Sequence, residues 1–414
     1  MKGGIYMIIF LRNFINKRMV SWILVVIIYI LCVYNATEIF AKDNLRLYAS
    51  SYALTDASTG RVLVGKNENL EMANASTTKI LTCIVALENC DLDENVVISE
   101  QAASQPKVRL GMGVGEIYPL RDMLYGLMLE SYNDCAVAIA EHVAGSTEKF
   151  AIMMNQKAAE IGCENTFFLT PNGLDMEQEN QFHHTTANDL CKIMAYCVWG
   201  SSEKDSFLEI TQTKDYSGSA NNHTYTFVNR NALLGQIDGL LTGKTGYTAK
   251  AGYCYVAAYE KDGERYCVAL LACGWPNNKN WKWQDTHTLL NYAINNYDMK
   301  RVIVEEIQEE IVVDGYIYPP QFWMLNRQDI IKITAEEHEY AVLLGNNENV
   351  RKEVLLYSNM ILPIKKEQIM GQCNIYIEDT LLDTIMLVAK DESNTWELKD
   401  ILKVILSQFF TFSS

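Results

Sequence analysis

The sequence predicts an α+β protein whose main domain has two lobes and is followed by a small β-rich domain. Strand-like segments near both ends of residues 51–273 enclose a block of helical patterns, which indicates one antiparallel sheet with a helical insertion. After about Lys300, short β-branched runs separated by polar turns replace the helical periodicity. We therefore expect a cleft between a sheet lobe and a helical lobe, with a separate β domain behind it.

The sheet lobe is predicted from apolar and β-branched segments that pair as hairpins. Its strands are expected at 51–56, 61–64, 238–247, 252–260 and 265–273. Apolar residues at helical spacing predict helices at 76–89, 120–130, 134–144, 147–161 and 186–198, and a closing helix from Trp281 to Tyr297. The helical lobe therefore lies within the chain between the second and third strands.

The C-terminal part divides into a β-rich region and a terminal amphipathic segment. Short runs predict strands around Val302–Val304, Ile311–Val313, Ile330–Ile333 and Val354–Leu356. From Trp396 to Phe410, apolar residues recur on one helical face. Such a helix is too short to span a bilayer, and two interpretations stay open: it lies in a membrane surface, or it docks on its own domain.

The N-terminus has the pattern of an export signal. Basic residues at positions 12–18 precede the apolar run Trp22–Val33, which is short for a membrane span and typical of a signal-peptide core. Ala36 or Ala41 could mark the cleavage site, and an uncleaved anchor is the alternative. In either case we expect residues 1–43 to direct the rest of the chain to the outer face of the cell membrane or to the cell wall.

Composition and charge exclude several classes of function. With 35 Lys and Arg against 51 Asp and Glu, the formal net charge is −16, so a nucleic-acid partner is not expected. The 11 cysteines form no CxxC pair, and we expect most of them to be small buried hydrophobic residues. The histidines include the neighbours His183 and His184 but no HExxH motif. We therefore expect no metal site and no organic cofactor.

The first of three short motifs is Ser76-Thr-Thr-Lys79, at the start of a predicted helix. Residues three apart share a helical face with Cβ atoms about 5–6 Å apart, so Lys79 can reach the Ser76 hydroxyl. An apolar surround and a second cation nearby would lower the lysine pKa and make a neutral amine available as a base. The alternative is an ordinary serine cap followed by a solvated lysine.

The second motif, Ser131-Tyr-Asn133, joins two predicted helices. We expect Asp134 to cap the helix that begins at Cys135, which leaves Ser131 and Asn133 free to face a cleft. A serine in that position can pass a proton to a leaving amine, and an asparagine amide can hold a peptide group. The alternative is a polar interhelical turn in which all three side chains act as caps.

The third motif, Lys244-Thr-Gly246, lies on a predicted strand. Gly243 and Gly246 permit close approach of a ligand to the backbone, and Lys244 with Thr245 would place a cation and a hydroxyl beside a carboxylate. The alternative is a glycine-rich edge strand with an exposed lysine.

In combination and order, the three motifs resemble those of the penicillin-recognising serine hydrolases. The sequence around the motifs is similar to that of the D-alanyl-D-alanine carboxypeptidases, the low-molecular-weight penicillin-binding proteins, over roughly residues 48–298. The segments that carry the resemblance are 73–82, 124–134, 170–175 and 242–248. The resemblance implies a β-lactamase/transpeptidase-like catalytic domain and, after residue 300, a β-rich domain with a membrane-binding helix.

The resemblance also implies roles for the motif residues. Ser76 would be the acylated nucleophile, Lys79 its base and Ser131 a proton shuttle, while Asn133 would bind substrate. Lys244, Thr245 and Gly246 would hold the terminal carboxylate, and the backbone N–H groups of Ser76 and Tyr247 would form the oxyanion hole. Two positions depart from the family pattern: Tyr132 replaces a usual glycine and is expected to reshape the cleft, and Asn172 replaces a common histidine.

The expected function is a serine carboxypeptidase that removes the terminal D-alanine from peptidoglycan stem pentapeptides and is inhibited by β-lactams. The expected domains are 1–43, 44–299, 300–390 and 391–414. A class A β-lactamase is the first alternative, but the chain lacks the ExxLN string of its deacylating glutamate. The second alternative is a non-catalytic wall-binding or β-lactam-sensing module, against which the three intact motifs argue.

Overall fold

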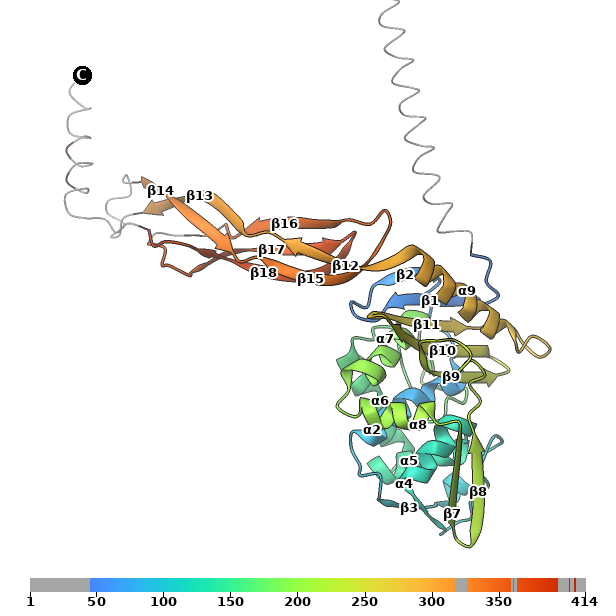
Figure 1. The fold of residues 1–414 in the computed structure, drawn as a ribbon. Coiled ribbons are helices and arrows are strands. Elements are labelled where there is room, and N and C mark those ends of the chain that lie inside the picture. The colour runs from blue at the N-terminus through green and yellow to red at the C-terminus, as the bar shows by residue number, and fades with distance from the viewer. Residues whose placement is uncertain are drawn as a thin grey trace, which may run out of the picture.

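The computed structural model describes residues 45–316 and 326–393, apart from 359, 361 and 362, together with Leu402 and Leu406. A mixed α/β domain is joined to an elongated β domain that extends away from it (Figure 1). The predicted export segment lies outside the described residues. So does the predicted terminal helix, except that Leu402 and Leu406 are helical and exposed. Within the described residues, no helix is long and apolar enough to cross a membrane.

A five-stranded antiparallel sheet forms one lobe of the first domain, with the strand order β2-β1-β11-β10-β9. The strands are β1 (Ser51–Asp56), β2 (Val62–Lys66), β9 (Leu240–Thr248), β10 (Gly252–Lys261) and β11 (Glu264–Leu271). Pairing of β1 with β11 brings the two ends of the domain together, with Ala53 opposite Ala269. The prediction of one sheet with a helical insertion is therefore confirmed, and β9 is left as an edge strand.

Helices cover both faces of the sheet because alternate residues of each strand enter different cores. Tyr255 and Val268 pack with the closing helix α9 (Trp281–Asn296), while Val256 and Ala269 pack with the helical lobe. That lobe contains η1 (Ala75–Thr78), α2 (Lys79–Leu87), α3 (Glu100–Ala103), α4 (Leu120–Tyr125), η2 (Gly126–Glu130), α5 (Asn133–Ala144), α6 (Thr147–Ile161), α7 (Ala187–Ala195), η3 (Tyr196–Gly200) and α8 (Lys204–Gln212). Every residue of α2 is buried, so this helix is the centre of the lobe.

The predicted helices are all present, but short elements between them were not predicted. These are α3, α8 and three small hairpins, β3 (Asn95–Val97) with β4 (Ile117–Pro119), β5 (Glu177–Gln178) with β6 (Gln181–Phe182), and β7 (Asp215–Ala220) with β8 (His223–Val228). The sequence of β7 is polar and glycine-containing, so it has no strand-like alternation. Tertiary contacts stabilise it instead, since the Tyr216 hydroxyl donates to Asp122 and its ring stacks on Tyr125.

One capping prediction is wrong. The helix expected to begin at Cys135 begins at Asn133, so Asp134 lies within its first turn rather than at the cap. The buried Asp134 carboxylate accepts hydrogen bonds from the backbone N–H groups of Leu110 and Gly111, at 3.0 and 2.8 Å. It therefore ties a neighbouring loop to α5, a long-range role that local sequence does not reveal.

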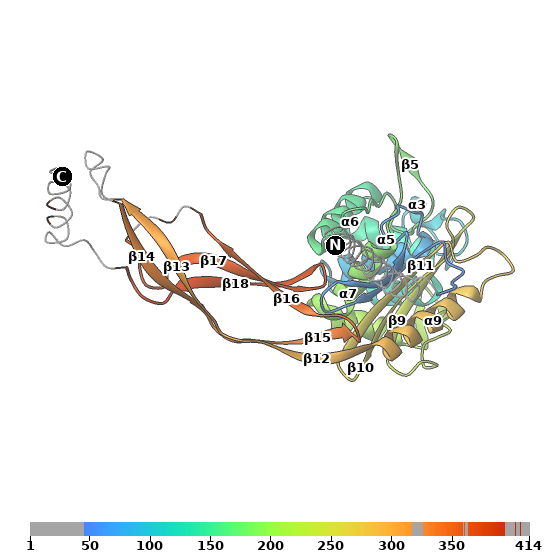
Figure 2. The same cartoon turned by 90° about the horizontal axis from the view of Figure 1, so that it is seen from above.

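The β domain contains all four strand regions predicted from β-branched runs. Its five-stranded sheet has the order β13-β14-β18-β17-β16, and β12 pairs with β15 beside it (Figure 2). The strands are β12 (Tyr297–Val304), β13 (Ile307–Tyr316), β14 (Asn326–Ala335), β15 (His338–Gly345), β16 (Val350–Leu356), β17 (Ile369–Ile377) and β18 (Thr380–Ala389). Buried residues such as Ile333, Ile375 and Leu387 form a core separate from those of the first domain.

The two domains meet without a linker, because α9 ends at Asn296 and β12 begins at the next residue. The boundary expected between residues 299 and 300 thus falls inside β12. The Arg61 guanidinium, 6% exposed, lies 2.6 Å from the Glu348 carboxylate and donates to the Leu343 carbonyl at 2.7 Å. Leu343 itself packs with Leu290 of α9 in a core of the first domain.

Candidate active site

The first motif forms a tight turn that runs directly into α2. Ser76 lies in the single-turn helix η1, and Lys79 is the first residue of α2. The Lys79 Nζ lies 2.9 Å from the Ser76 Oγ. The spacing of three residues on one helical face therefore produces the contact that the sequence predicts.

Buried hydrogen bonds stabilise the turn around Ser76. Ala75, which precedes the serine, has a φ of 50°, and its carbonyl accepts from the Thr78 hydroxyl at 2.8 Å. The same hydroxyl lies 2.8 Å from the Nε2 of His183. Burial lowers the pKa of His183 to about 3, so its ring is neutral. Since the His183 Nδ1 accepts from the Leu169 N–H, its Nε2 donates to Thr78.

Lys79 is fully buried, and its amine has three polar neighbours. Besides Ser76, its Nζ donates to the side-chain oxygen of Asn133 at 2.9 Å and to the backbone carbonyl of Asn172 at 2.7 Å. Burial, followed by the nearby charge of Lys244, holds the pKa of Lys79 well below its usual range. A buried cation without a paired carboxylate is costly, so the environment favours the neutral amine.

The second motif follows a widened turn at the end of α4. This π-helical turn, η2, ends at Glu130, and the next residue, Ser131, has a left-handed backbone with a φ of 66°. Asn133 then begins α5, and its amide nitrogen donates to the Pro106 carbonyl at 3.2 Å, which directs its oxygen toward Lys79. The unusual backbone at Ser131 places this serine and Asn133 on the same side of the junction, facing the cleft.

The third motif lies on the edge strand β9, across the cleft from the helices. The Lys244 Nζ donates to the Ser131 Oγ at 3.0 Å. Burial lowers the pKa of Lys244 to about 7, although the charge of Glu130 opposes this shift. A Cβ added to Gly246 would lie 2.9 Å from both the Asn74 carbonyl oxygen and the Ser76 nitrogen. Glycine at this position therefore lets β9 approach the turn that carries Ser76.

All eight candidate residues come together in one place. Six of them line a cleft of about 520 Å³: Ser76, Ser131, Asn133, Thr245, Gly246 and Tyr247. The other two lie beneath the surface of the cleft, where Lys79 contacts Ser76 and Lys244 contacts Ser131. Segments separated by more than 100 residues thus meet at one cleft between the lobes, as the sequence predicts.

The structure adds residues to the cleft that sequence reasoning missed. Lys107, Glu130, Arg230, Tyr253, Lys282 and Trp283 also line it. Arg230 pairs with the buried Glu130 at 2.8 Å. The backbone carbonyl of Asn172, which contacts Lys79, was also missed, since a main-chain atom has no residue signature. The only sign of this residue in the sequence was that Asn172, just before Gly173, stands where the family commonly has histidine.

The expectation that Tyr132 reshapes the cleft is wrong. Its ring packs edge-on against Phe227 of β8, with ring centroids 5.6 Å apart, and it contacts the helical lobe. Tyr132 is absent from the described residues that line the cleft. The packing against Phe227 accommodates a ring at the position where the family usually has glycine.

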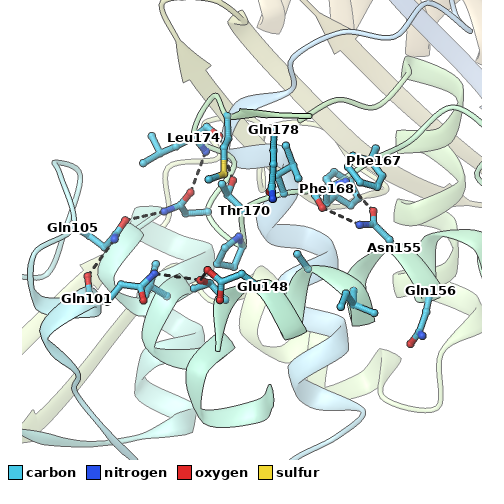
Figure 3. Close-up of a pocket in the computed structure, with 18 of the residues that line it drawn as sticks. Gln101, Gln105, Glu148, Asn155, Gln156, Phe167, Phe168, Thr170, Leu174 and Gln178 are labelled. Carbon is cyan, nitrogen blue, oxygen red and sulfur yellow. Dashed lines mark hydrogen bonds between the residues drawn. The ribbon is translucent and has the colours of Figure 1, made fainter. Parts of the chain in front are cut away.

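A second, larger groove of about 900 Å³ lies beside the cleft and shares Leu174 with it. Figure 3 shows that Asn155, Phe167, Phe168 and Thr170 surround it. Its walls are mainly apolar, and it contains neither a serine nor a lysine among the described residues. The volume of a cavity therefore does not identify the reactive site. The candidate nucleophile and the two lysines with lowered pKa values all lie at the smaller cleft.

The cysteines match the expectation of buried hydrophobic residues. All the cysteines that the structure describes are free, and all except Cys90 and Cys163 are buried. Burial raises the pKa of Cys83, Cys191 and Cys254, so these thiols stay protonated at neutral pH. None of the described cysteines lines the cleft, so its nucleophile candidates are hydroxyl groups, and Ser76 is the one beside the buried Lys79 amine.

Comparison with known proteins agrees with this geometry. A family model described as D-alanyl-D-alanine carboxypeptidase matches residues 38–273, and one for the C-terminal domain of penicillin-binding protein 5 matches residues 309–395. The D-alanyl-D-alanine carboxypeptidase DacF of Bacillus subtilis is 30% identical over 91% of this chain and 94% of its own length.

Solved structures give the same fold. The D-alanyl-D-alanine carboxypeptidase DacD from Francisella tularensis matches 86% of this chain and 96% of its own with a TM-score of 0.63, at 23% identity. Penicillin-binding protein D2 from Listeria monocytogenes, solved in a cefotaxime-bound form, matches 60% of this chain and 98% of its own with a TM-score of 0.52, at 25% identity.

The two-lobed fold, with a serine and a buried lysine at its cleft, defines the class as a serine hydrolase with a transpeptidase-like catalytic domain. The second domain is the β-rich C-terminal domain of the penicillin-binding protein 5 type. Within this class, the chain belongs to the D-alanyl-D-alanine carboxypeptidase family. It is a serine-type carboxypeptidase of the penicillin-binding group.

Proposed function

We propose that Ser76 is the nucleophile and Lys79 the general base of a carboxypeptidase that removes the terminal D-alanine from peptidoglycan stem pentapeptides. The observation that carries this assignment is the set of partners around the Lys79 amine. The Asn133 side-chain oxygen and the Asn172 carbonyl can only accept hydrogen bonds, so they engage the two N–H groups of a neutral amine. The remaining lone pair faces the Ser76 hydroxyl at 2.9 Å.

Acylation begins when the Ser76 oxygen attacks the carbonyl carbon of the D-alanyl-D-alanine bond. Its proton passes to Lys79, and the carbonyl oxygen becomes an oxyanion. The backbone N–H groups of Ser76 and Tyr247 stabilise this negative charge. The close approach of Gly246 to the Ser76 nitrogen supports this assignment, because it brings the two N–H groups to the same end of the cleft.

The leaving D-alanine is held and protonated from the opposite side of the cleft. Lys244 and Thr245 bind its carboxylate, and Asn133 binds the peptide group of the acyl part. Ser131 donates its hydroxyl proton to the departing amine and is reprotonated with the proton that Lys79 took from Ser76, which restores the neutral Lys79 amine. Lys244, whose Nζ lies 3.0 Å from the Ser131 Oγ, stays charged and stabilises the oxygen of Ser131 during this transfer. Water then hydrolyses the ester on Ser76, with Lys79 again accepting the proton.

A β-lactam acylates the same serine because its strained amide resembles the terminal dipeptide. The Listeria protein solved in a cefotaxime-bound form supports this inference, because 98% of its chain can be aligned with this chain. Penicillin and the pentapeptide therefore compete for one cleft.

The proposed location is the outer face of the cell membrane, where stem peptides of the wall are accessible. In this proposal residues 1–43 direct export, 44–299 catalyse, and 300–390 hold the catalytic domain away from the surface. Residues 391–414 attach the chain to that surface. The elongated shape of the β domain supports the spacing role (Figure 1).

The assignment of Ser76 is tested by intact mass after exposure to benzylpenicillin, together with release of D-alanine from a pentapeptide. We expect one adduct on the peptide that contains Ser76. Ser76→Ala should lose the adduct, and release should fall more than about a thousandfold. Ser217→Ala, at an exposed serine of β7, is the matched control and should behave as wild type.

The outcomes separate the alternatives. Labelling without D-alanine release would favour a β-lactam-sensing module, and rapid turnover of penicillin would favour a class A β-lactamase. Release that persists in Ser76→Ala would refute the nucleophile.

A further inference from the structure

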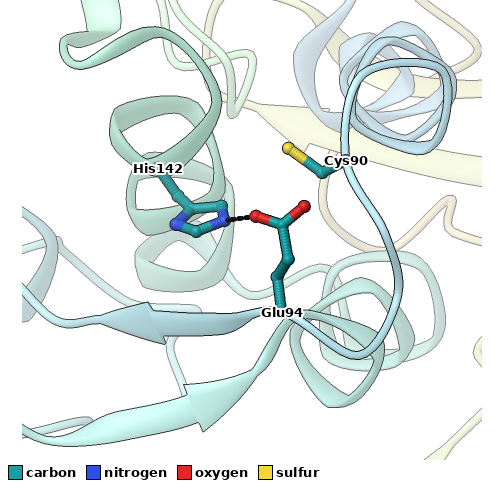
Figure 4. Close-up of side chains that lie close together, drawn as sticks. All are labelled: Cys90, Glu94 and His142. Carbon is teal, nitrogen blue, oxygen red and sulfur yellow. Dashed lines mark hydrogen bonds and ion pairs between the residues drawn. The ribbon is translucent and has the colours of Figure 1, made fainter.

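Three side chains of the types that bind zinc gather at the far side of the helical lobe. They are Cys90, Glu94 and His142, and Figure 4 shows the thiol, the carboxylate and the imidazole directed toward one another. We propose that this cluster is a structural site for a divalent metal ion of the zinc class.

The spacing of the three groups suits one small ion. One ligand atom of each residue lies within 4.8 Å of the other two, and the His142 Nε2 is 2.8 Å from the Glu94 Oε2. Tetrahedral zinc, with bonds of about 2.0–2.3 Å, separates its ligand atoms by roughly 3.3–3.7 Å. Small rotations of the Cys90 and Glu94 side chains therefore bring all three atoms into coordination.

The polypeptide orients all three ligand residues. His142 lies on α5, and the Cys90 N–H donates to the Ala86 carbonyl at the end of α2. The Glu94 Oε1 accepts from the Asp91 N–H at 2.8 Å, so one carboxylate oxygen is anchored and the other faces His142. Oriented ligands of this kind bind a metal more tightly than free side chains, because less freedom is lost on binding.

The chemistry of the donor set favours zinc over magnesium or calcium. Sulfur and imidazole nitrogen are ligands for zinc, whereas magnesium and calcium prefer oxygen. On binding, the Cys90 thiol releases its proton to water, and the thiolate and the Glu94 carboxylate balance the charge of a divalent ion. Glu94 and His142 are partly exposed, so an ion enters from solvent and water completes the tetrahedron.

The position of the cluster indicates that a bound metal ion would have a structural role and would not take part in the reaction. Cys90 follows the end of α2, and His142 lies in the last turn of α5. The first residues of the same two helices are Lys79 and Asn133, which are hydrogen-bonded to each other at the cleft. A metal ion would thus join α2 and α5 at the ends opposite the active site, and it is independent of the proposed reaction.

Cobalt titration of the reduced full-length protein tests the site directly, because a cobalt–thiolate bond has its own near-ultraviolet absorption. We expect one equivalent of Co²⁺ to produce this band together with visible bands of tetrahedral cobalt, and Zn²⁺ to displace it. Cys90→Ser and His142→Ala should lose the band. Cys163→Ser, at the other described cysteine that is only partly buried, should keep it. A band that survives in Cys90→Ser, or no saturable binding in wild type, would overturn the site.

A second measurement on the wild-type chain needs no variant. Zinc should protect Cys90, but not Cys163, from alkylation followed by mass spectrometry. Saturating zinc should also raise the Tm by about 5 °C, and it should leave D-alanine release unchanged. Equal alkylation of Cys90 with and without zinc would contradict the proposal even if the variants fail to fold.

Discussion

At the scale of single residues, the proposed reaction needs Lys79 to act as a base, and the surroundings of its amine lower its pKa. Lys79 has no carboxylate in direct contact, its neighbours Asn133 and Asn172 offer only oxygen acceptors, and a second lysine lies nearby. Each of these features disfavours the cation, so burial that would be costly for a structural lysine is useful for a base.

Lys244 provides a prediction about pH. Its pKa is lowered to about 7 by burial, and the proposed grip on the substrate carboxylate needs the protonated form. Protonation is lost as the pH rises through that value, so kcat/KM should fall above about pH 7. As the pH falls through the lowered pKa of Lys79, the base gains a proton and kcat/KM should fall again.

The assignment of the alkaline limb is checked with Lys244→Arg, because a guanidinium stays charged far above neutral pH. We expect the alkaline limb of the kcat/KM profile to move up by more than about 2 pH units in this variant. Lys250→Arg, at an exposed lysine after β9, is the control and should leave the profile unchanged. If the alkaline limb of the kcat/KM profile does not move in Lys244→Arg, the limb reports the titration of another group.

At the scale of elements, the candidate site lies where short, irregular segments pack against regular helices and strands. The turn η1, the left-handed Ser131 and the segment Asn172–Gly173 all lie between better-ordered helices and strands. Gly173 has a φ of 81°, and a Cβ there would lie 1.9 Å from the Ala75 carbonyl oxygen. The close contact keeps the Asn172 carbonyl against Lys79.

Gly173→Ala should therefore separate this segment from η1. We expect D-alanine release to fall by about 100-fold, since a displacement of about 1 Å in a catalytic group has such an effect. Gly145→Ala is a matched control, because Gly145 has a φ of 80° with nothing near its missing Cβ. That control should lose about 1–2 kcal/mol of unfolding free energy from backbone strain and keep its activity. Equal losses of activity in both variants would contradict the contact.

At the scale of the whole molecule, one ion pair and one shared core join the two domains. Arg61, ahead of β2, meets Glu348 in the turn after β15, and Leu343 of β15 enters a core of the first domain. Since α9 continues directly into β12, the β domain is attached by several contacts rather than by a flexible linker.

Arg61→Leu is expected to loosen this junction without affecting chemistry. Loss of a largely buried pair costs about 3–5 kcal/mol when one partner remains, so the interdomain angle should vary more widely. Small-angle X-ray scattering should show a broader distribution of extensions, while D-alanine release stays at the wild-type rate. Lys261→Ala removes an exposed pair with Asp238 and should change neither quantity. An unchanged scattering curve in Arg61→Leu would show that other contacts hold the angle.

Much of this fold could be predicted because its elements have strong local patterns. The helix at 147–161 and the hairpin that joins β10 to β11 follow from apolar spacing and turn residues. The β7–β8 hairpin could not be predicted, since Tyr216 is held by Asp122 and Tyr125 from a distant part of the chain. The role expected of Tyr132 was wrong for the same reason, because its direction depends on Phe227.

The sequence by itself determined the fold class, the family and the eight candidate residues of the cleft, because motif spacing and apolar periodicity are local properties of the chain. Only the tertiary structure decided that Lys79 is buried between two oxygen acceptors, that Asn172 contributes a backbone carbonyl, and that Cys90 meets His142. Burial and contacts between distant segments arise when the lobes pack. They set the pKa of a lysine, which no spacing of residues can specify.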